Sequence, residues 1–253
     1  MELNSEVKQH RKPEYPIHSL ILNRWSPRAM TGEGLMDDEL MPLFEAAKWA
    51  PSSYNNQSWR FVYAKRDTPV WSVFLDLLVP PNQIWCKNSA VLVVVLSKKT
   101  FDRDGQASLT HSFDTGAAVE NLALQGTAQG LVVHAMQGFD YVKAQMALEV
   151  PDGYAVEAML AIGKRASKES LPIESQPYEM PNQRKPLKEI VMEGKFRGWF
   201  VVFPTPRRVI VFVCFCLNGV CVHSTLERQE KTSYHCYSRS DWICFDILKN
   251  HKR

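Results

Sequence analysis

The pattern of hydrophobic and polar residues predicts a mixture of helices and strands over the first 196 residues. A helix is expected over 37–49, and Pro51 ends it because proline disfavours helical geometry in the residue before it. Trp59 to Ala64 alternates between apolar and polar residues, which predicts a strand. Val91 to Leu96 is apolar throughout and has the length of a strand, so we expect it to be buried on both faces.

The strongest helical pattern covers 112–129 and is rich in Gly and Ala. Gly130, a usual C-cap residue, follows it, and the many small side chains would let another helix approach closely. Shorter elements are expected as helices over 70–78, 140–150 and 187–192 and strands over 132–136 and 155–162. Helices and strands are mixed without a regular βαβ repeat, which predicts an α+β fold.

The composition of the chain changes after Phe196. Residues 197–253 carry nine Lys or Arg and four Asp or Glu, a net charge of +5, against −2 for the first 196 residues, and hold five of the six cysteines. We therefore expect a flexible N-terminal arm over 1–17, a globular domain over 18–196 and an atypical tail over 197–253. A shifted reading frame, an unspliced segment or a fused end would each explain the tail, and comparison of the coding DNA with the transcript tests all three.

The overall composition excludes several classes of protein. Hydrophobic residues make up 45% of the chain, and the formal net charge of +3 does not indicate nucleic-acid binding. The polar N-terminus has no signal-peptide core and the domain has one cysteine, so we expect a cytoplasmic protein that does not depend on disulfides. The clean apolar run Val209–Leu217 is shorter than the roughly 20 residues of a membrane span, so no membrane association is expected.

The domain shows no motif of side-chain or metal catalysis. It has no set of metal ligands, no phosphate-loop motif and no dinucleotide glycine fingerprint, so no catalytic side chain and no metal are predicted. Paired Cys and His residues in the tail suggest zinc, but their spacing is unusual for it: Cys214, Cys216, Cys221, His223, His235 and Cys236. Four aromatic residues and a cysteine are expected in the core: Trp71, Phe74, Trp85, Cys86 and Phe101. The chemistry of an enzyme on this domain would come from a cofactor.

Four polar segments suggest a binding site when they are taken together. In Arg24-Trp25-Ser26-Pro27-Arg28, two guanidinium groups and a hydroxyl suit a phosphate monoester, although the segment alone could be a solvated basic turn. Residues 50–59 place hydroxyls and amides in a loop between a helix and a strand. Residues 134–140 include Gly138, which could let a ligand approach the backbone, and 182–187 hold a basic pair.

In this order and at these separations the segments resemble the nitroreductase family of flavin mononucleotide (FMN) enzymes. Arg24 to Arg28 looks like the family's Arg-x-Ser-x-Arg/Lys opening. Pro51 to Trp59 is similar to its Pro-Ser-Ser-x-Asn-x-Gln-Pro-Trp loop, with Ser58 where proline is usual. Residues 114–131 look like its long dimer-core helix, and the last two segments match later signatures, so the resemblance covers about Ser19 to Phe196.

The resemblance implies an α+β sandwich with a central, mainly antiparallel sheet flanked by helices, working as an intertwined homodimer with FMN at the subunit interface. It implies hydride transfer from NADPH or NADH through the flavin to a nitroaromatic, quinone or related acceptor in a two-step, ping-pong reaction. It also implies FMN-binding residues: Arg24, Ser26, Arg28 and Arg184 at the phosphate; Ser52, Ser53, Asn55 and Gln57 at the phosphate, ribityl chain or ring edge; and Met136, Gln137 and Gly138 beside the ring. Asn182 stands where the family often has a basic residue, which puts one phosphate contact in doubt.

Two alternatives to this function stay open at the level of sequence. One is a specialised flavin enzyme of the same fold, such as a reductive dehalogenase. The other is a flavin-binding protein that has lost turnover through its altered C-terminus. The pattern of residues favours neither NADH nor NADPH and identifies no acceptor.

Overall fold

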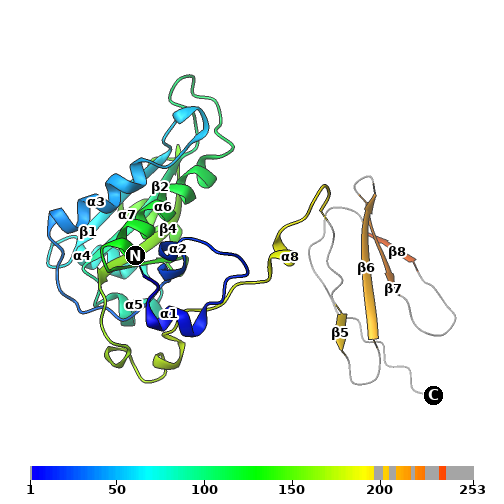
Figure 1. Cartoon of the computed structure of the whole chain (residues 1–253). Coiled ribbons are helices and arrows are strands. Elements are labelled where there is room, and N and C mark those ends of the chain that lie inside the picture. Colours follow the sequence, from blue (N-terminus) through cyan, green and yellow to red (C-terminus); the bar gives the residue numbers. More distant parts are fainter. Residues whose placement is uncertain (1, 197–201, 205–208, 218–219, 226–233, 238–253) are drawn as a thin grey trace, which may run out of the picture. The chain divides into compact units, whose positions relative to one another are not determined.

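The computed structural model describes residues 2–196, 202–204, 209–217, 220–225 and 234–237, and the chain divides into two compact units, 1–184 and 185–253. In the first unit a four-stranded sheet lies between layers of helices (Figure 1). Its helices are α1 (Ser5–His10), α2 (Ser19–Asn23), α3 (Asp37–Lys48), α4 (Trp71–Leu77), α5 (Pro80–Cys86), α6 (His111–Ala128) and α7 (Tyr141–Ala147). Its strands are β1 (Trp59–Lys65), β2 (Val91–Lys98), β3 (Leu131–Met136) and β4 (Tyr154–Lys164), and short 3-10 turns cover Ser53–Asn55, Lys168–Ser170 and Gln176–Tyr178.

The sheet is antiparallel throughout, in the order β1-β2-β4-β3, so β2 and β4 are central. Every residue of β2 from Val91 to Ser97 is buried. Because successive side chains of a strand point to opposite faces, β2 contributes Leu92, Val94 and Leu96 to one hydrophobic cluster and Val91, Val93 and Val95 to the other. The prediction of a strand buried on both faces is confirmed.

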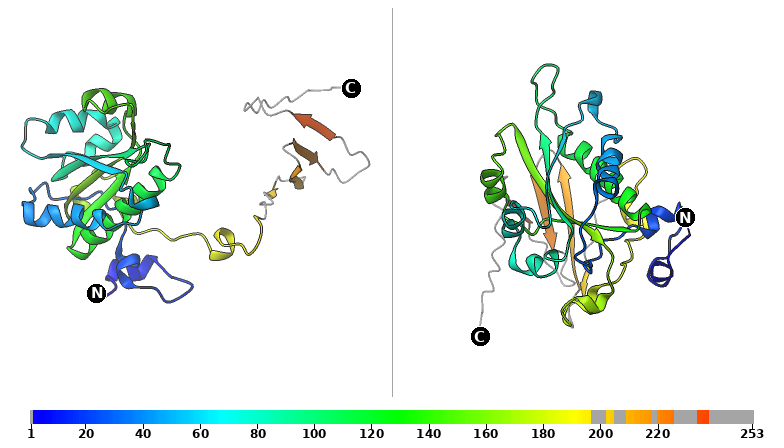
Figure 2. Two further views of the ribbon diagram at one scale, coloured as in Figure 1. Left: turned by 90° about the horizontal axis from the view of Figure 1, so that it is seen from above. Right: turned by 90° about the vertical axis from the view of Figure 1, so that its left-hand side faces the viewer.

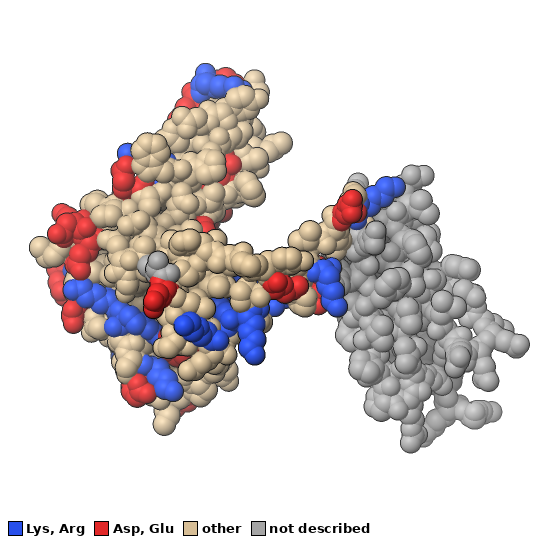
Figure 3. Space-filling model, in the orientation of Figure 1, with Lys and Arg blue, Asp and Glu red and all other residues tan. Residues whose placement is uncertain are grey.

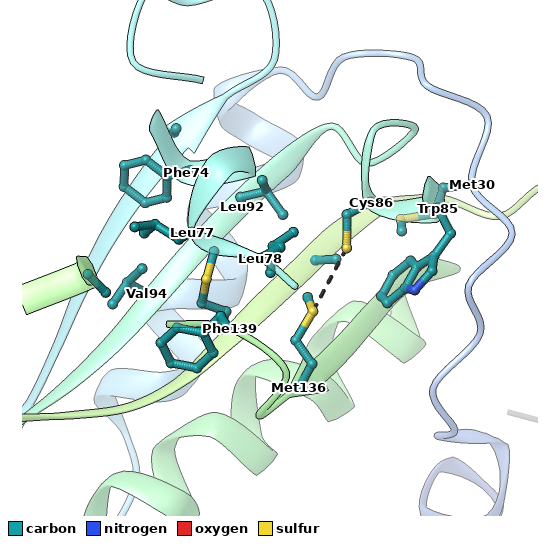
Figure 4. Close-up of a cluster of buried hydrophobic side chains, with 14 of the residues drawn as sticks. Met30, Phe74, Leu77, Leu78, Trp85, Cys86, Leu92, Val94, Met136 and Phe139 are labelled. Atoms are coloured by element: carbon teal, nitrogen blue, oxygen red, sulfur yellow. Dashed lines mark hydrogen bonds between the residues drawn. The ribbon is translucent and has the colours of Figure 1, made fainter. Parts of the chain in front are cut away.

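Helices cover both faces of the sheet (Figure 2, right-hand view). Helices α4, α5 and α7 supply one cluster, in which Phe74, Trp85 and Met136 pack against β2 (Figure 4). Helices α3 and α6 supply the other, with Leu40, Leu43, Ala118 and Leu122 against the opposite face. This arrangement is the predicted α+β sandwich.

Helix α6 matches the predicted helix over 112–129 to within one residue at each end. A Cβ atom at Gly126 would lie 2.5 Å from Val133 Cγ2, so glycine is what allows α6 to pack closely on β3. A Cβ atom at Gly116, in contrast, would meet no other atom within 4 Å. Near the C-terminal end of α6, Gly126 therefore allows close packing inside the chain. Near the N-terminal end, Gly116 lies on an open surface.

The N-terminal segment differs from the predicted flexible arm. Ser5–His10 forms α1, the Val7 side chain is fully buried, and the Asn4 backbone N–H donates to Asn23 Oδ1 at 2.9 Å. The polar composition of 1–17 conceals these contacts, because one apolar residue, the Arg11 side chain and a few backbone groups hold the segment. A short helix that was not predicted, α5, begins with Pro80 and Pro81 in its first turn, where proline is well tolerated.

The second unit contains α8 (Leu187–Ile190) and four strands, β5 (Val202–Pro204), β6 (Val209–Leu217), β7 (Val220–Thr225) and β8 (Tyr234–Tyr237), which pair antiparallel in chain order. The apolar run Val209–Leu217 is thus a strand. Among the described residues, no helix is both long and apolar enough to cross a membrane. The side chains suggested for zinc lie outside the described part of the chain. The first compact unit ends at Arg184. The predicted domain boundary after Phe196 stays a prediction.

Candidate functional site

The Arg24–Arg28 segment connects α2 to the sheet. Arg24 is the C-cap residue of α2, and Met30 pairs with Arg165 just beyond the end of β4, so the segment runs along that end of the sheet. Arg24 Nε lies 3.2 Å from Glu120 Oε1 of α6, and its side chain is 19% exposed. Ser26 and Arg28 are partly exposed, so a phosphate could approach the segment from solvent.

A third arginine, which the sequence did not single out, joins this segment to the far end of the unit. Arg11 is 7% exposed, and its Nη1 donates to the carbonyl oxygens of Leu22 at 2.6 Å and Arg24 at 2.7 Å. Its Nε donates to the carbonyl oxygen of Asn182 at 3.1 Å. Arg184 follows two residues later, so Arg11 connects both segments that were predicted to bind the phosphate.

The arginines Arg11, Arg24 and Arg184 form a local excess of positive charge. Burial, followed by the charges of Arg184 and then Arg24, lowers the pKa of Arg11 to about 10. The Nη2 atom of Arg11 is buried and has no hydrogen-bond partner among the described residues. In Figure 3, Lys and Arg side chains gather over the part of the surface that holds α1. A dianion bound here would relieve the repulsion, so these residues fit a phosphate monoester.

The loop at 52–58 is held in a strained conformation by its own hydrogen bonds. Tyr54, Asn55 and Gln57 have positive φ angles of 51°, 55° and 50°, which non-glycine residues adopt infrequently. The Gln57 backbone N–H donates to Ser52 Oγ at 3.0 Å, and the Ser53 backbone N–H donates to Asp114 Oδ2 at 2.9 Å. Strain of this kind persists at ligand sites when the surrounding contacts fix it.

The loop at 52–58 and the Arg24–Arg28 segment lie at different levels of the sheet. Trp59, at the end of the loop, is in register with Ser97 and through it with Ala155, whereas Met30 pairs with Arg165. Both nevertheless contact α6, Ser53 through Asp114 and Arg24 through Glu120, and these two helix positions are about 9 Å apart along the helix axis. Among the described residues, no hydrogen bond joins Ser52, Ser53, Asn55 or Gln57 to the Arg24–Arg28 segment.

Strand β3 contacts the Arg24–Arg28 segment through His134, three residues before the segment that begins at Gln137. The His134 Nδ1–H donates to the Pro27 carbonyl oxygen at 2.9 Å, which attaches β3 to the Arg24–Arg28 segment. Gln137 and Gly138 follow three and four residues later, and Gln137 is exposed. The Met136 side chain instead enters the core, with its sulfur 3.8 Å from Cys86 Sγ (Figure 4), so this side chain is not available to a ligand.

Packing within the chain requires glycine at position 138. A Cβ atom there would lie 2.5 Å from Asn82 Nδ2 and 3.2 Å from Val79 Cγ2. The Gly138 carbonyl oxygen accepts from the Val79 backbone N–H at 3.1 Å and from Asn82 Nδ2 at 3.0 Å. The sequence predicted close approach of a ligand at this position, and the structure shows close approach of α5.

His134 makes the stability of this region dependent on pH. Burial lowers its pKa below the ordinary 6.5, and its ring lies 4.6 Å from the Trp85 ring. The unfolded chain therefore binds the proton more readily, so stability is complete above pH 6.5 and falls as the pH drops toward the folded pKa. We expect the unfolding temperature of the wild type to fall more steeply between pH 7.5 and 5.5 than that of His134→Asn. Equal slopes in thermal melts would contradict this assignment.

Comparison with known proteins identifies the fold and the family. The nitroreductase family model matches residues 21–70 and 74–164, more than half of the chain. The chain belongs to the nitroreductase family. A crystal structure described as an oxidoreductase containing FMN is 41% identical, with a TM-score of 0.73 over 78% of this chain and 100% of that one.

Two further relatives of this nitroreductase chain agree with that result. A putative nitroreductase from Desulfovibrio desulfuricans, solved in complex with FMN, is 26% identical, with a TM-score of 0.57 over 73% of this chain and 100% of that one. A putative NADH dehydrogenase/NAD(P)H nitroreductase from Rhodopseudomonas palustris is 28% identical over 159 residues, 56% of this chain and 80% of that protein. The predicted family and fold class are confirmed.

The nitroreductase domain also has a cavity that the sequence did not indicate. It has a volume of about 310 Å3 and lies between the loop at 52–58 and residues 101–103. Arg103 covers the Tyr54 ring at 4.1 Å, Phe101 meets that ring edge-on, and Arg60 also lines the cavity. Phe101 thus lies at a cavity rather than in the core as predicted, while Phe74, Trp85 and Cys86 are buried as expected and Trp71 packs against the core at its edge.

The described residues contain no group of three or more His, Cys, Asp or Glu that could hold a metal ion. The donors that the site does contain are guanidinium groups, hydroxyls, amides and backbone N–H groups. These are the partners of a phosphate and a polar heterocycle, and they agree with the cofactor found in the two solved relatives.

Proposed function

We propose that this nitroreductase is an FMN-dependent oxidoreductase that transfers a hydride from NADPH or NADH, through the flavin, to nitroaromatic, quinone or related acceptors in a ping-pong reaction. The observation that carries the proposal is the cluster of Arg24 and Arg184 beside the buried Arg11, whose pKa their charges lower. A relative that is 41% identical along its whole length contains FMN. The predicted cytoplasmic location stays a prediction.

The phosphate of FMN would be held by side chains of the Arg24–Arg28 segment. Arg24 and Arg28 would each offer a planar fork of N–H donors, Ser26 a hydroxyl, and Arg184 a further charge. The backbone N–H groups of Arg28 and Ala29 already donate to Glu179, so these two groups are not available to the phosphate. Charge-assisted contacts of this kind are about twice as strong as neutral ones.

Residues after β3 would meet the ring. FMN held here would supply the hydride-transfer chemistry, so the chain need not supply a nucleophile. The Gly138 carbonyl is fixed by Val79 and Asn82, which fixes the direction of the neighbouring peptide groups. Backbone N–H groups at Gln137 and Gly138 would then be held in place to orient the ring without rearrangement of the chain.

The loop at 52–58 would reach this site from a second copy of the chain. In one copy the loop and the phosphate segment contact α6 at different positions, Asp114 and Glu120, and share no hydrogen bond among the described residues, so each site would be incomplete there. Gly116 on α6 faces open space, and Phe113 on the same helix is 80% exposed. We propose that this face of α6 packs against the partner in a homodimer, which would bring the two halves of each site together.

A bulky side chain at Gly116 tests the dimer without disturbing the fold of one chain. A Cβ atom there meets nothing within 4 Å, so Gly116→Arg should fold normally but elute as a monomer with weakened FMN binding. Gly153→Arg is the matched control, because Gly153 is also exposed with no atom within 4 Å of its Cβ. A dimeric Gly116→Arg variant in size-exclusion chromatography would contradict the proposed interface.

Turnover with a quinone tests the proposed reaction directly. The FMN-loaded protein should oxidise NADPH or NADH in the presence of a quinone, and the rate should fall to background when FMN is omitted. Initial rates measured against both substrates should give the parallel double-reciprocal lines of a ping-pong reaction. A flavin-loaded protein that is inert with quinones and nitroaromatics would contradict the function while leaving the family unchanged.

A further inference from the structure

A buried carboxylate lies against the backbone of the Arg24–Arg28 segment. The side chain of Glu179, at the end of the Gln176–Tyr178 turn, is 0% exposed. Its two oxygens accept the Arg28 backbone N–H, both at 3.0 Å, and one of them accepts the Ala29 N–H at 3.0 Å. Arg165 forms an ion pair with Glu179, so the buried charge is both paired and hydrogen-bonded.

A buried guanidinium holds the other end of the same segment. Arg11 bonds the carbonyl oxygens of Leu22, Arg24 and Asn182, which lie 11, 13 and 171 positions away in the sequence. The three carbonyl groups belong to the end of α2, to the first arginine of the proposed phosphate site, and to a residue two positions before Arg184. One side chain therefore fixes the spacing between the two segments that contribute arginines.

We propose that Arg11 and Glu179 are positioning residues that hold the Arg24–Arg28 segment in its phosphate-binding shape, and so set the affinity for FMN through its phosphate. This inference rests on the proposed function, because it assumes that the phosphate binds at the arginine cluster. Neither residue belongs to the predicted site, and neither needs to touch the flavin ring.

The physical basis is the cost of ordering a loop. Fixing the backbone of one residue costs about 1–2 kcal/mol, and a long arginine side chain adds to this cost. A segment already fixed by hydrogen bonds at Arg24, Arg28 and Ala29 loses little further freedom when phosphate binds. Without Arg11 or Glu179, phosphate binding would also have to order the segment, and the affinity for FMN would fall.

Conservative variants of the full-length chain separate positioning from folding. In Glu179→Gln the side chain keeps its size, but it has one acceptor oxygen instead of two and leaves Arg165 unpaired. In Arg11→Lys the charge is kept, but an ammonium group cannot reproduce the fork that bonds three carbonyl groups. Matched controls are Glu45→Gln on α3 and Arg66→Lys, whose guanidinium also bonds a backbone carbonyl, that of Lys87.

The comparison of FMN with riboflavin makes the test specific, because riboflavin has the same ring but no phosphate. Titrations of the apo-protein, followed by flavin fluorescence, should show FMN affinity reduced about tenfold to a hundredfold in Glu179→Gln and Arg11→Lys. Riboflavin affinity should stay within about twofold of the wild type, since the ring contacts are unchanged. Both controls should bind FMN as the wild type does, and thermal melts establish that each variant is folded.

The outcomes distinguish this inference from the proposed function. Folded variants with a wild-type ratio of FMN to riboflavin affinity would overturn the positioning role, and so would an equal loss of both ligands. A wild-type chain that binds neither flavin would overturn the proposed function and this inference together. Should Arg11→Lys fail to fold, Glu179→Gln and Glu179→Asp carry the same test.

Discussion

Replacing Arg24 and Arg28 together by alanine is expected to raise the FMN dissociation constant about a hundredfold or more and to yield colourless protein. Each guanidinium would make charge-assisted hydrogen bonds to the phosphate, worth about 1.5–3 kcal/mol apiece, and 1.4 kcal/mol is a factor of ten in affinity. The bound flavin is measured by visible absorbance after gel filtration, and the affinity by fluorescence titration.

The control for that variant removes the same charge from another part of the surface. Lys99→Ala combined with Lys143→Ala also lowers the net charge by two, at exposed positions on other elements. If both double variants lost FMN equally, the effect would be general electrostatic attraction and the phosphate site would lie elsewhere. A double arginine variant that stays yellow would contradict the assignment outright.

The largest effect on stability is expected in the centre of the sheet. Ile162 of β4 is fully buried between the sheet and the α3–α6 layer, so Ile162→Ala should lower the free energy of unfolding by about 3 kcal/mol, through lost burial and the cavity left behind. Ile173→Ala removes the same atoms at a position that is 75% exposed and should change stability by less than about 0.5 kcal/mol.

Urea unfolding followed by circular dichroism measures both variants. The expected result is a lower midpoint for Ile162→Ala with an unchanged slope, and a wild-type curve for Ile173→Ala. Similar midpoints for the two variants would mean that the sheet is not the centre of the core.

The regular elements of the sheet could be predicted because their hydrophobic pattern is local. The apolar run Val91–Leu96 became β2, buried on both faces, and the small-residue pattern over 112–129 became α6. The same patterns could not reveal α1, since Val7 is the only buried apolar residue that marks it. They also could not show that Phe101 lines a cavity, because that depends on how two loops meet.

The residues proposed to touch the phosphate could be predicted from the sequence, but the residues that hold the Arg24–Arg28 segment in place could not. Arg24, Ser26 and Arg28 stand together in the sequence, so their shared chemistry is visible. Arg11 and Glu179 reach this segment from distant positions and act on its backbone, which has no sequence signature. No local pattern could show how the loop at 52–58 lies relative to this segment, because that follows from the register of three strands and from the contacts of both segments with α6.

Absorption at visible wavelengths, recorded while the purified full-length protein passes through size-exclusion chromatography, tests the central claim most directly. The account predicts flavin absorbance that co-elutes with protein at the mass of a dimer, twice the 29.0 kDa of one chain. It also predicts that a colourless preparation becomes yellow when FMN is added and stays yellow through the column. A protein that elutes colourless and takes up no added FMN would contradict the proposal that this nitroreductase works through a flavin bound between two copies.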